Sequence, residues 1–514
     1  MAATSPPFPV SPHRGAITIC VMLATIMQAL DTTIANVALP YMQSSLSASQ
    51  DQINLVLTSY IVTAAIMMPA TGWMAARWGR KNFFLLSVLG FTATSVLCGL
   101  ATSLDEMVLF RLLQGIFGAP LVPLSQAVLL DEYPREQHGS AMALWGVGVM
   151  VGPILGPMLG GWLTEYYNWR WVFYINLPVG ILTLLGLSAY MKRTAATPGL
   201  FFDWFGFLTL ALAIGSLQMM LDRGEQLEWF DSPEIILEAA CSGLCAYLFT
   251  VHIFTAGAGR TFLDLRLFRD RNFVTGIVFI FVIGVILLAT LALLAPFLQT
   301  LLGYPVLAAG VLLAPRGIGT MVAMMMVGRL MSRVDARWLV ALGLVLTALA
   351  LWQMSRWSLD VTRAMLVSTG VIQGLGLGFI FIPMSVITFA SLPPDLRTSG
   401  TALFSLSRNI GSSIGISVMI YLLGQNTHEV HAMLSAHLQP FREPLQHLPA
   451  MLNPATVGGR ALLDAIVTRQ AALVAYLGDF YIMFIIALAS LPMVLLMRHP
   501  DHPLDDEEVS AALE

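Results

Sequence analysis

Charged residues are scarce in this sequence. Asp, Glu, Lys and Arg make up 11% of its 514 residues, whereas soluble domains contain roughly 25%. Apolar residues make up 57%. This balance excludes a soluble globular protein and predicts an all-α integral membrane protein. The formal net charge of −4 argues against a nucleic acid as partner, because proteins that bind nucleic acids present a basic surface.

Cysteine is scarce as well, and its placement argues against a metal site. All four cysteines fall inside apolar runs with no His or carboxylate beside them: Cys20, Cys98, Cys241 and Cys245. A structural metal site needs a complete set of such ligands. We therefore expect no metal ion and no cofactor.

Enzymatic motifs are missing or misplaced. The sequence has no Gly-x4-Gly-Lys-Ser/Thr loop, which argues against direct use of ATP. The segment 411–415 fits the Gly-x-Ser-x-Gly nucleophile pattern by letters, but it lies in an apolar helical run rather than at a strand-to-helix turn. We expect no catalytic residues and a protein that is not an enzyme.

Long apolar runs are what the sequence has in abundance. A membrane span needs about 20 apolar residues, and fourteen runs of that kind are present, near 16–39, 53–75, 83–102, 106–130, 139–163, 171–191, 203–221, 234–256, 274–301, 306–331, 338–356, 363–390, 400–424 and 478–497. The even number places both termini on one side. Sixteen Lys and Arg fall in loops on that side and seven on the other, so we expect both termini to be cytoplasmic.

An internal repeat divides the chain. At an offset of 259 residues, Gln114-Gly115 returns as Gln373-Gly374, Ser140 as Ser399, Gly152 as Gly411 and Gly156 as Gly415. Separately, Gly72-x4-Arg77 is echoed by Gly328-x4-Arg333. Each pair is eight spans apart, which a duplicated six-helix unit with two inserted helices explains. Repeated halves around a midplane site are typical of secondary transporters.

The repeat predicts a 6+2+6 organisation. Its parts are a cytoplasmic N-terminal tail (1–15), a six-helix half (16–198), two inserted helices (199–260), a second six-helix half (261–498) that includes a long outer loop (425–478), and an acidic cytoplasmic tail (499–514). The outer loop carries His428, His431, His437 and His447. We expect these histidines to be surface residues rather than metal ligands, and the loop to be a docking surface.

Ionisable residues inside spans are functional hypotheses by default. Asp31 in the first span is the principal candidate for carrying a proton, because burial favours its neutral form. Arg111 in the fourth span lies at a similar depth, so pairing is geometrically possible. The alternatives, a purely structural Asp31 and an Arg111 that tethers a carbonyl group, stay open.

Further polar residues in the spans are candidates for lining a substrate cavity: Gln28, Asn36, Gln114, Gln126, Arg316, Gln373 and Arg408. For the two arginines, a position facing the cavity and a bond to backbone are equally good interpretations.

A glycine-rich stretch marks the fifth span. Gly148, Gly152, Gly156 and Gly160 recur every fourth residue and so form one bare stripe on a helix. Small residues at this spacing let another helix approach closely, and Pro153 and Pro157 are expected to bend the helix. The stripe is either a packing seam or a seam along which helices rock.

Several motifs resemble one family. Gly152-Pro153-Ile-Leu-Gly156-Pro157-Met-Leu-Gly160-Gly161 resembles the fifth-helix antiporter motif of drug exporters in the major facilitator superfamily. The first-helix stretch 30–38 and the fourth-helix stretch 111–115 resemble motifs of its fourteen-helix drug:proton antiporter branch, most closely EmrB-type multidrug exporters. One departure is Ala76, which replaces the usual Asp of the loop between spans 2 and 3.

The resemblance implies a major facilitator fold with 14 transmembrane helices and a proton-coupled exporter of hydrophobic or amphipathic compounds in the cell inner membrane, which contributes to antibiotic resistance. Asp31 and Arg111 would couple transport to the proton gradient. An EmrA-like periplasmic adaptor and an outer-membrane channel are the implied partners. The alternatives are a narrow-specificity metabolite exporter of the same fold and a transporter-like ligand sensor without net flux.

Overall fold

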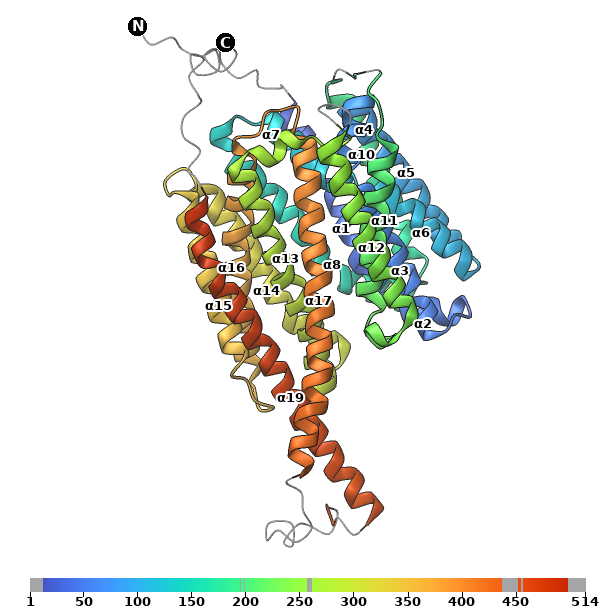
Figure 1. The fold of residues 1–514 in the computed structure, drawn as a ribbon, viewed down its shortest axis with the longest axis vertical. Helices are drawn as coiled ribbons and strands as arrows, with labels where there is room; N and C mark the ends of the chain where they lie inside the picture. The colour runs from blue at the N-terminus through green and yellow to red at the C-terminus, as the bar shows by residue number, and fades with distance from the viewer. Residues whose placement is uncertain are drawn as a thin grey trace.

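The computed structural model describes residues 13–194, 196–197, 199–256, 261–436, 452–453 and 456–497, and these are almost entirely helical (Figure 1). Most of both predicted tails, and His437 and His447, lie outside the described residues. The helices of the first half are α1 (Arg14–Ser45), α2 (Gln50–Ile53), α3 (Leu55–Met67), α4 (Thr71–Trp78), α5 (Arg80–Leu100), α6 (Leu104–Gly118), α7 (Leu121–Glu132), α8 (His138–Tyr166), α9 (Trp171–Tyr174) and α10 (Asn176–Tyr190).

Two helices follow, α11 (Trp204–Arg223) and α12 (Pro233–Thr255). The second half consists of α13 (Arg271–Pro296), a π-helical turn (Phe297–Leu301), α14 (Val306–Leu330), α15 (Ala336–Met354), α16 (Arg363–Ala390), α17 (Arg397–Ala436), α19 (Val457–Ala489) and a 3-10 segment (Leu491–Leu496).

The predicted number of membrane spans agrees with the structure. Within the described residues, thirteen helical segments are long and apolar enough to cross a membrane, and α3 with α4 makes a fourteenth, bent by 61°. The break between α3 and α4 contains Pro69, which has no backbone N–H and cannot continue the helix without a clash. The α6–α7 junction has Pro120 in the same role.

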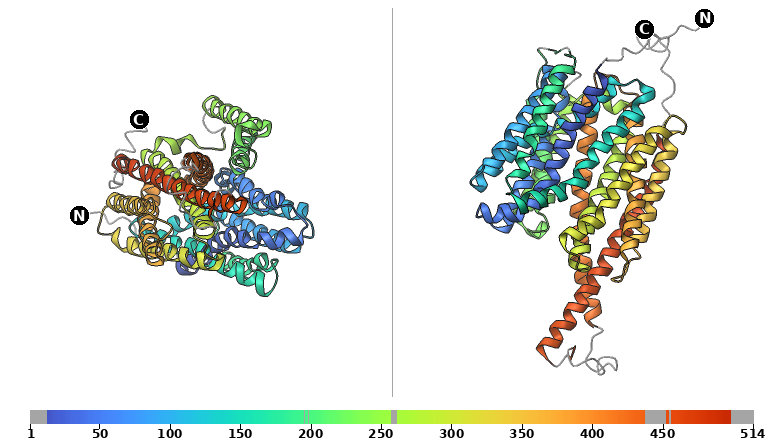
Figure 2. Two further views of the ribbon diagram at one scale, coloured as in Figure 1. Left: turned by 90° about the horizontal axis from the view of Figure 1, so that it is seen from below. Right: turned by 180° about the vertical axis from the view of Figure 1, so that it is seen from behind.

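The helices form two bundles that lie side by side (Figure 2). In the first, α1 packs against α8 and α10; in the second, α13 packs against α17, and α14 and α15 pack against α16. The pair α11–α12 lies at the edge, where α11 contacts α3 and α17. The most apolar stretch of α12 is only 11% buried, as suits a helix whose surface faces lipid.

Equivalent contacts recur in the two bundles, as the sequence repeat predicts. A Cβ on Gly115 would lie 2.7 Å from the carbonyl oxygen of Tyr60, and one on Gly374 would lie 2.9 Å from the carbonyl carbon of Arg316. Tyr60 and Arg316 are 256 residues apart, the same offset that separates Gly72 from Gly328. Glycine therefore brings span 4 against span 2, and span 12 against span 10, in the same way.

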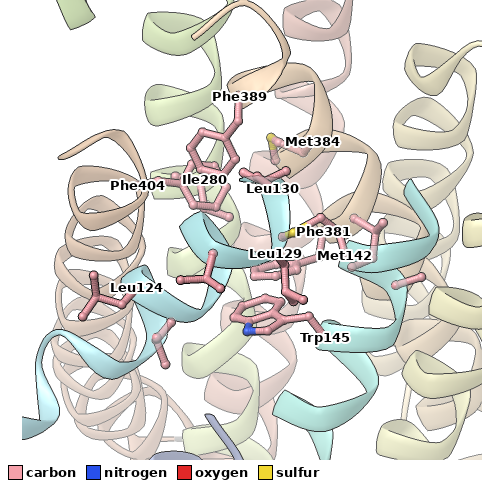
Figure 3. Packing of buried hydrophobic residues seen from close by; sticks show 14 of the residues in the cluster. Leu124, Leu129, Leu130, Met142, Trp145, Ile280, Phe381, Met384, Phe389 and Phe404 are labelled. Carbon is pink, nitrogen blue, oxygen red and sulfur yellow. The ribbon is translucent and has the colours of Figure 1, made fainter. Parts of the chain in front are cut away.

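The bundles meet in an apolar cluster toward the face at which α1 begins, here called the start face. Leu129, Leu130, Met142 and Trp145 of the first bundle pack with Ile280, Phe381, Met384, Phe389 and Phe404 of the second (Figure 3). Trp145 stacks on Phe381 with ring centroids 6.1 Å apart.

Polar contacts at the start face reinforce this closure. Arg397 of the second bundle donates from Nη1 to Asp131 Oδ1 over 2.7 Å and to the carbonyl oxygen of Leu130. Arg80 of the first bundle pairs with the same Asp131 and donates to the carbonyl of Pro394. Two cations from different halves therefore converge on one carboxylate.

The predicted outer loop 425–478 is helical over most of its described length. α17 continues to Ala436 and α19 begins at Val457, so the two helices are much longer than the predicted spans 400–424 and 478–497. Forty helical residues measure about 60 Å, twice the hydrocarbon thickness, so the helices project beyond the membrane (Figure 1). His431 Nε2 lies 2.9 Å from Asp464 Oδ1 and links the two projecting helices.

We predict that Asp131→Asn loosens the contact between the halves. The variant removes the shared anion from Arg80 and Arg397, and exposed or half-buried pairs of this kind contribute up to about 1 kcal/mol each. Asn82 and Trp338 are exposed and lie on different halves. Spin labels at these two positions should show a larger population of long label-to-label distances in the variant than in the wild type. Asp395→Asn, which breaks an exposed pair with Arg266 inside the second half, is the control and should leave the distribution unchanged.

Candidate functional site

A buried ion pair lies inside the first bundle. Arg111 Nη1 donates to Asp31 Oδ2 over 2.7 Å, and both side chains are only 1% exposed. Asp31 comes from the middle of α1 and Arg111 from α6. The structure thus brings together the two residues that the sequence proposed for proton coupling.

Amide side chains complete the shell around the carboxylate. Gln114 Nε2 donates to Asp31 Oδ1 over 2.9 Å, and Asn176 Nδ2 donates to the same oxygen over 3.1 Å. Asn176 also donates to Ser95 Oγ, which in turn donates to the carbonyl of Phe173. Asp31 therefore receives hydrogen bonds from three side chains on two other spans, Arg111 and Gln114 on span 4 and Asn176 on span 6.

Arg111 is held by more than its carboxylate. Its Nε donates to the carbonyl oxygen of Val56 over 3.0 Å, and Nη1 also donates to Gln114 Oε1 over 2.8 Å. Its guanidinium carbon lies 4.5 Å from the ring centroid of Tyr60, a cation–π distance. Arg111 thus has neutral partners besides Asp31.

The glycine stripe positions this cluster. α8 packs on α1 through Gly152 and Gly156, where Cβ atoms would lie 2.6 Å from the carbonyl carbon of Ala29 and 2.7 Å from Thr33 Cβ. Thr33 Oγ1 donates to the carbonyl oxygen of Gly152 over 3.0 Å. Only glycine permits such an approach, and it occurs within one turn of Asp31.

The stripe does not lie between the halves. Gly148 and Gly160 also face α1, with Cβ positions 3.3 Å from side-chain atoms of Met22 and Val37. The contact of α8 with the second half uses other residues, including Ile154 against Gly317. Any rocking along the stripe would therefore move α8 against α1. Gly161 faces open space and Pro153 is exposed; the side chain of Pro157 is not among those described.

The remaining candidates in the first half are dispersed. Gln28 Nε2 donates to the hydroxyl of Tyr60 over 3.2 Å and so adjoins the cluster. Asn36 is exposed on α1. Gln126 is buried on α7, and its Oε1 has no hydrogen-bond partner among the described residues.

In the second half, Arg316, Gln373 and Arg408 lie apart from Asp31. Arg316 Nη2 donates to the carbonyl oxygen of Leu287 over 3.0 Å. Gln373 is fully buried with neither amide atom bonded in the described part of the chain. The guanidinium of Arg408 lies 5.7 Å from the ring centroid of Phe381.

Sequence reasoning missed several members of the site. Asn176, Ser95 and Tyr60 are single neutral polar residues in apolar spans, and no spacing signal distinguishes them from packing residues. Asp479 on α19 could have been found, because it is ionisable and stands inside an apolar run. It is 0% exposed, and neither of its carboxylate oxygens has a hydrogen-bond partner among the described residues.

Two bundles with repeated contacts and an ion pair buried within the apolar helices define a polytopic membrane protein built like a secondary transporter. The family model of the Major Facilitator Superfamily matches residues 21–416. The chain therefore belongs to the major facilitator superfamily of membrane transporters, and it is not an enzyme.

Curated relatives span nearly its whole length. The chain is 34% identical over 499 residues to the fatty acid resistance protein FarB of Neisseria gonorrhoeae, covering 96% of this chain and 98% of FarB. It is 35% identical over 448 residues to the multidrug export protein EmrB of Escherichia coli K12, covering 86% and 87%. The structure of the human organic anion transporter MFSD10 superposes with a TM-score of 0.60 at 14% identity, over 93% of this chain and 100% of that one, which confirms the fold.

We predict that Asp31→Asn and Arg111→Gln each lower the stability of the folded protein. Removing one partner of a buried pair leaves the other charge uncompensated, at a cost of roughly 3–5 kcal/mol. The double variant should lose clearly less stability than the sum of the two single losses. Thermal unfolding in detergent measures all three. Strict additivity of the two losses would contradict the direct pairing of these side chains.

A second prediction concerns the stripe. Gly152→Ala forces α8 away from the Ala29 backbone and should destabilise the protein by about 1–3 kcal/mol, as overpacking does. Gly161→Ala adds the same methyl group in open space and serves as the matched control. Equal melting temperatures for both variants would show that the close α1–α8 contact is not required.

Proposed function

We propose that this protein is a proton-driven exporter of hydrophobic and amphipathic compounds, located in a bacterial inner membrane and working by alternating access between its two six-helix halves. The observation that carries the proposal is the fully buried Asp31–Arg111 pair. An ionisable pair at this depth is costly and is found mainly on ion and proton pathways. Relatives named for multidrug export and fatty acid resistance support an exporter of such compounds.

Proton exchange at Asp31 follows from the hydrogen bonds around it. A proton that binds to a carboxylate oxygen cancels the charge and turns one acceptor into an O–H donor. The hydrogen bond from Arg111 then weakens, because it is no longer assisted by the carboxylate charge. Arg111 can move away from Asp31 and still keep the carbonyl oxygens of Val56 and Gln114 as acceptors.

This exchange couples to transport through a change of packing. With the start face cytoplasmic, as the distribution of Lys and Arg predicts, the cluster around Trp145 and Phe381 closes the cytoplasmic side. A proton entering from outside would neutralise Asp31 and favour release of the exported compound outward. The proton would be shed inward when the halves reopen, so the proton gradient is the energy source.

The projecting ends of α17 and α19 suit the predicted periplasmic adaptor and outer-membrane channel. With the start face cytoplasmic, they extend into the periplasm. They carry exposed apolar side chains, among them Leu434, Val457 and Ile466, which suit a protein–protein interface. We propose this projection, rather than a flexible loop, as the adaptor-docking element.

The decisive experiment compares dye efflux by wild-type protein, Asp31→Asn and Asp31→Glu in energised cells at matched expression. We expect wild-type efflux that an uncoupler stops, no efflux above background with Asp31→Asn, and partial efflux with Asp31→Glu, which keeps a titratable carboxylate. Asp105→Asn changes an exposed carboxylate and should behave as wild type.

Other results would favour other functions. Full efflux by Asp31→Asn would remove Asp31 from the coupling role. No efflux of any dye by folded wild-type protein would favour the narrow-specificity metabolite exporter, and ligand binding without flux in vesicles would favour the sensor.

A further inference from the structure

The second half has a group of residues that corresponds, through the sequence repeat, to the cluster around Asp31, but the charged residues in the two groups differ. The repeat offset of 259 residues aligns Gln114 with Gln373 and Arg111 with Gly370. The offset of 256 residues between span 2 and span 10 aligns Tyr60 with Arg316. The two residues also make equivalent contacts, since Gly115 packs on the backbone of Tyr60 and Gly374 packs on the backbone of Arg316.

The position of Asp31 itself is apolar in the second half. In the first half, Gly152 packs on Ala29 and Gly156 packs on Thr33. In the second half, their repeat partners Gly411 and Gly415 pack on Phe281 and Val285. The resulting offset of 252 residues aligns Asp31 with Ile283, which is 1% exposed. Among the described residues, the second half thus has a buried cation in Arg316 and an apolar side chain where the first half has Asp31.

Arg316 has one neutral partner and one free donor. Its Nη2 bonds to the Leu287 carbonyl, while the buried Nη1 has no partner among the described residues. The side chain is 7% exposed, and it forms no ion pair within the described ranges. A cation desolvated in this way is unfavourable unless an anion or strong acceptor joins it.

The space beside Arg316 is built to hold such a group. A cavity of about 20 Å³ lies beside Arg316 and Gly370, enough for one water-sized group. Arg316, Gly370 and Trp357 line it together with apolar side chains. Trp357 is 4% exposed and its Nε1–H also has no partner in the described part of the chain.

Gln373 adds a third unsatisfied group nearby. It follows Gly370 by three residues on α16, so the two lie on the same helix face. It is 0% exposed, and neither its Nε2 donor nor its Oε1 acceptor has a partner among the described residues. Arg316 and Trp357 therefore line the cavity with N–H donors that have no acceptor in the described part of the chain, and an unpaired amide follows one turn along α16.

We propose that Arg316, with Trp357, forms an anion-binding site in the second half that accepts a carboxylate oxygen of an amphipathic substrate or a small free anion such as chloride. This inference rests on the proposed export function and specifies part of its substrate range. The bound anion neutralises Arg316, as the ionised Asp31 neutralises Arg111 in the first half.

Anion binding by the purified full-length protein tests the proposal. Thermal unfolding would be followed in detergent at constant ionic strength, with sodium gluconate as the reference salt and either sodium chloride or submicellar sodium decanoate as the probe. Decyltrimethylammonium controls for binding of the alkyl chain. We expect decanoate, chloride or both to stabilise the wild type above gluconate, and decyltrimethylammonium not to do so.

The variants locate the effect. Arg316→Gln should lower the affinity for the anion by roughly tenfold or more, because charge-assisted hydrogen bonds are the strong ones. Trp357→Phe keeps an aromatic ring and loses the N–H, and it should lower the affinity by a smaller factor. Arg193→Gln removes an exposed cation and should have no effect. Stabilisation by decanoate alone identifies a substrate carboxylate, and stabilisation by chloride alone identifies a free anion.

Two outcomes would overturn the proposal: no anion stabilises the wild type above gluconate, or the stabilisation is unchanged in both Arg316→Gln and Trp357→Phe. If Arg316→Gln does not fold, Trp357→Phe carries the test. Uncoupler-sensitive efflux of a cationic dye by the wild type, measured in parallel, separates a failure of this site from a failure of the export function.

Discussion

A carboxylate in the interior of a membrane protein must be neutralised, and the arrangement of the first half follows from that need. Asp31 meets Arg111, Gln114 and Asn176, which come from spans 4 and 6, and Arg111 in turn holds the backbone of span 2 at Val56. Four spans therefore converge on one charge. The glycine stripe on α8 then allows span 5 to close against α1 within a turn of Asp31. A change of charge at Asp31 would alter the contacts of every helix around it.

The two halves share a fold and differ in charge. Contacts through Gly115 and Gly374, Gly152 and Gly411, or Gly156 and Gly415 are equivalent, because close helix packing depends on backbone shape. Side chains at the same level have diverged: Asp31 and Arg111 correspond to Ile283 and Gly370, and Tyr60 corresponds to Arg316. One half thus holds a compensated ion pair and the other an uncompensated cation beside a cavity. We propose that this asymmetry gives the halves distinct tasks, proton exchange in the first and recognition of an anionic group in the second.

The fold could be predicted from the sequence almost completely, and the site only in part. Apolar run length and the Gly, Pro and Gln positions of the repeat are strong signals, since lipid permits few alternatives to spanning helices. Asp31 and Arg111 were found because charges inside spans are rare. Asn176 and Ser95 were not, because neutral polar residues are common in spans and only tertiary packing selects them. The extent of helix within 425–478 could not be predicted, because a helix that leaves the membrane loses the apolar signal while it keeps its backbone hydrogen bonds.

We propose that movement of substrate and movement of protons are one process at Asp31. Purified protein in proteoliposomes with a pH-sensitive dye inside tests this directly, with a substrate gradient imposed and no initial pH gradient. The account predicts that substrate flowing down its gradient drives protons in the opposite direction, that the pH change scales with substrate flux, and that Asp31→Asn abolishes it. Substrate flux by the wild type without any pH change, or the same pH change with Asp31→Asn, would contradict the account.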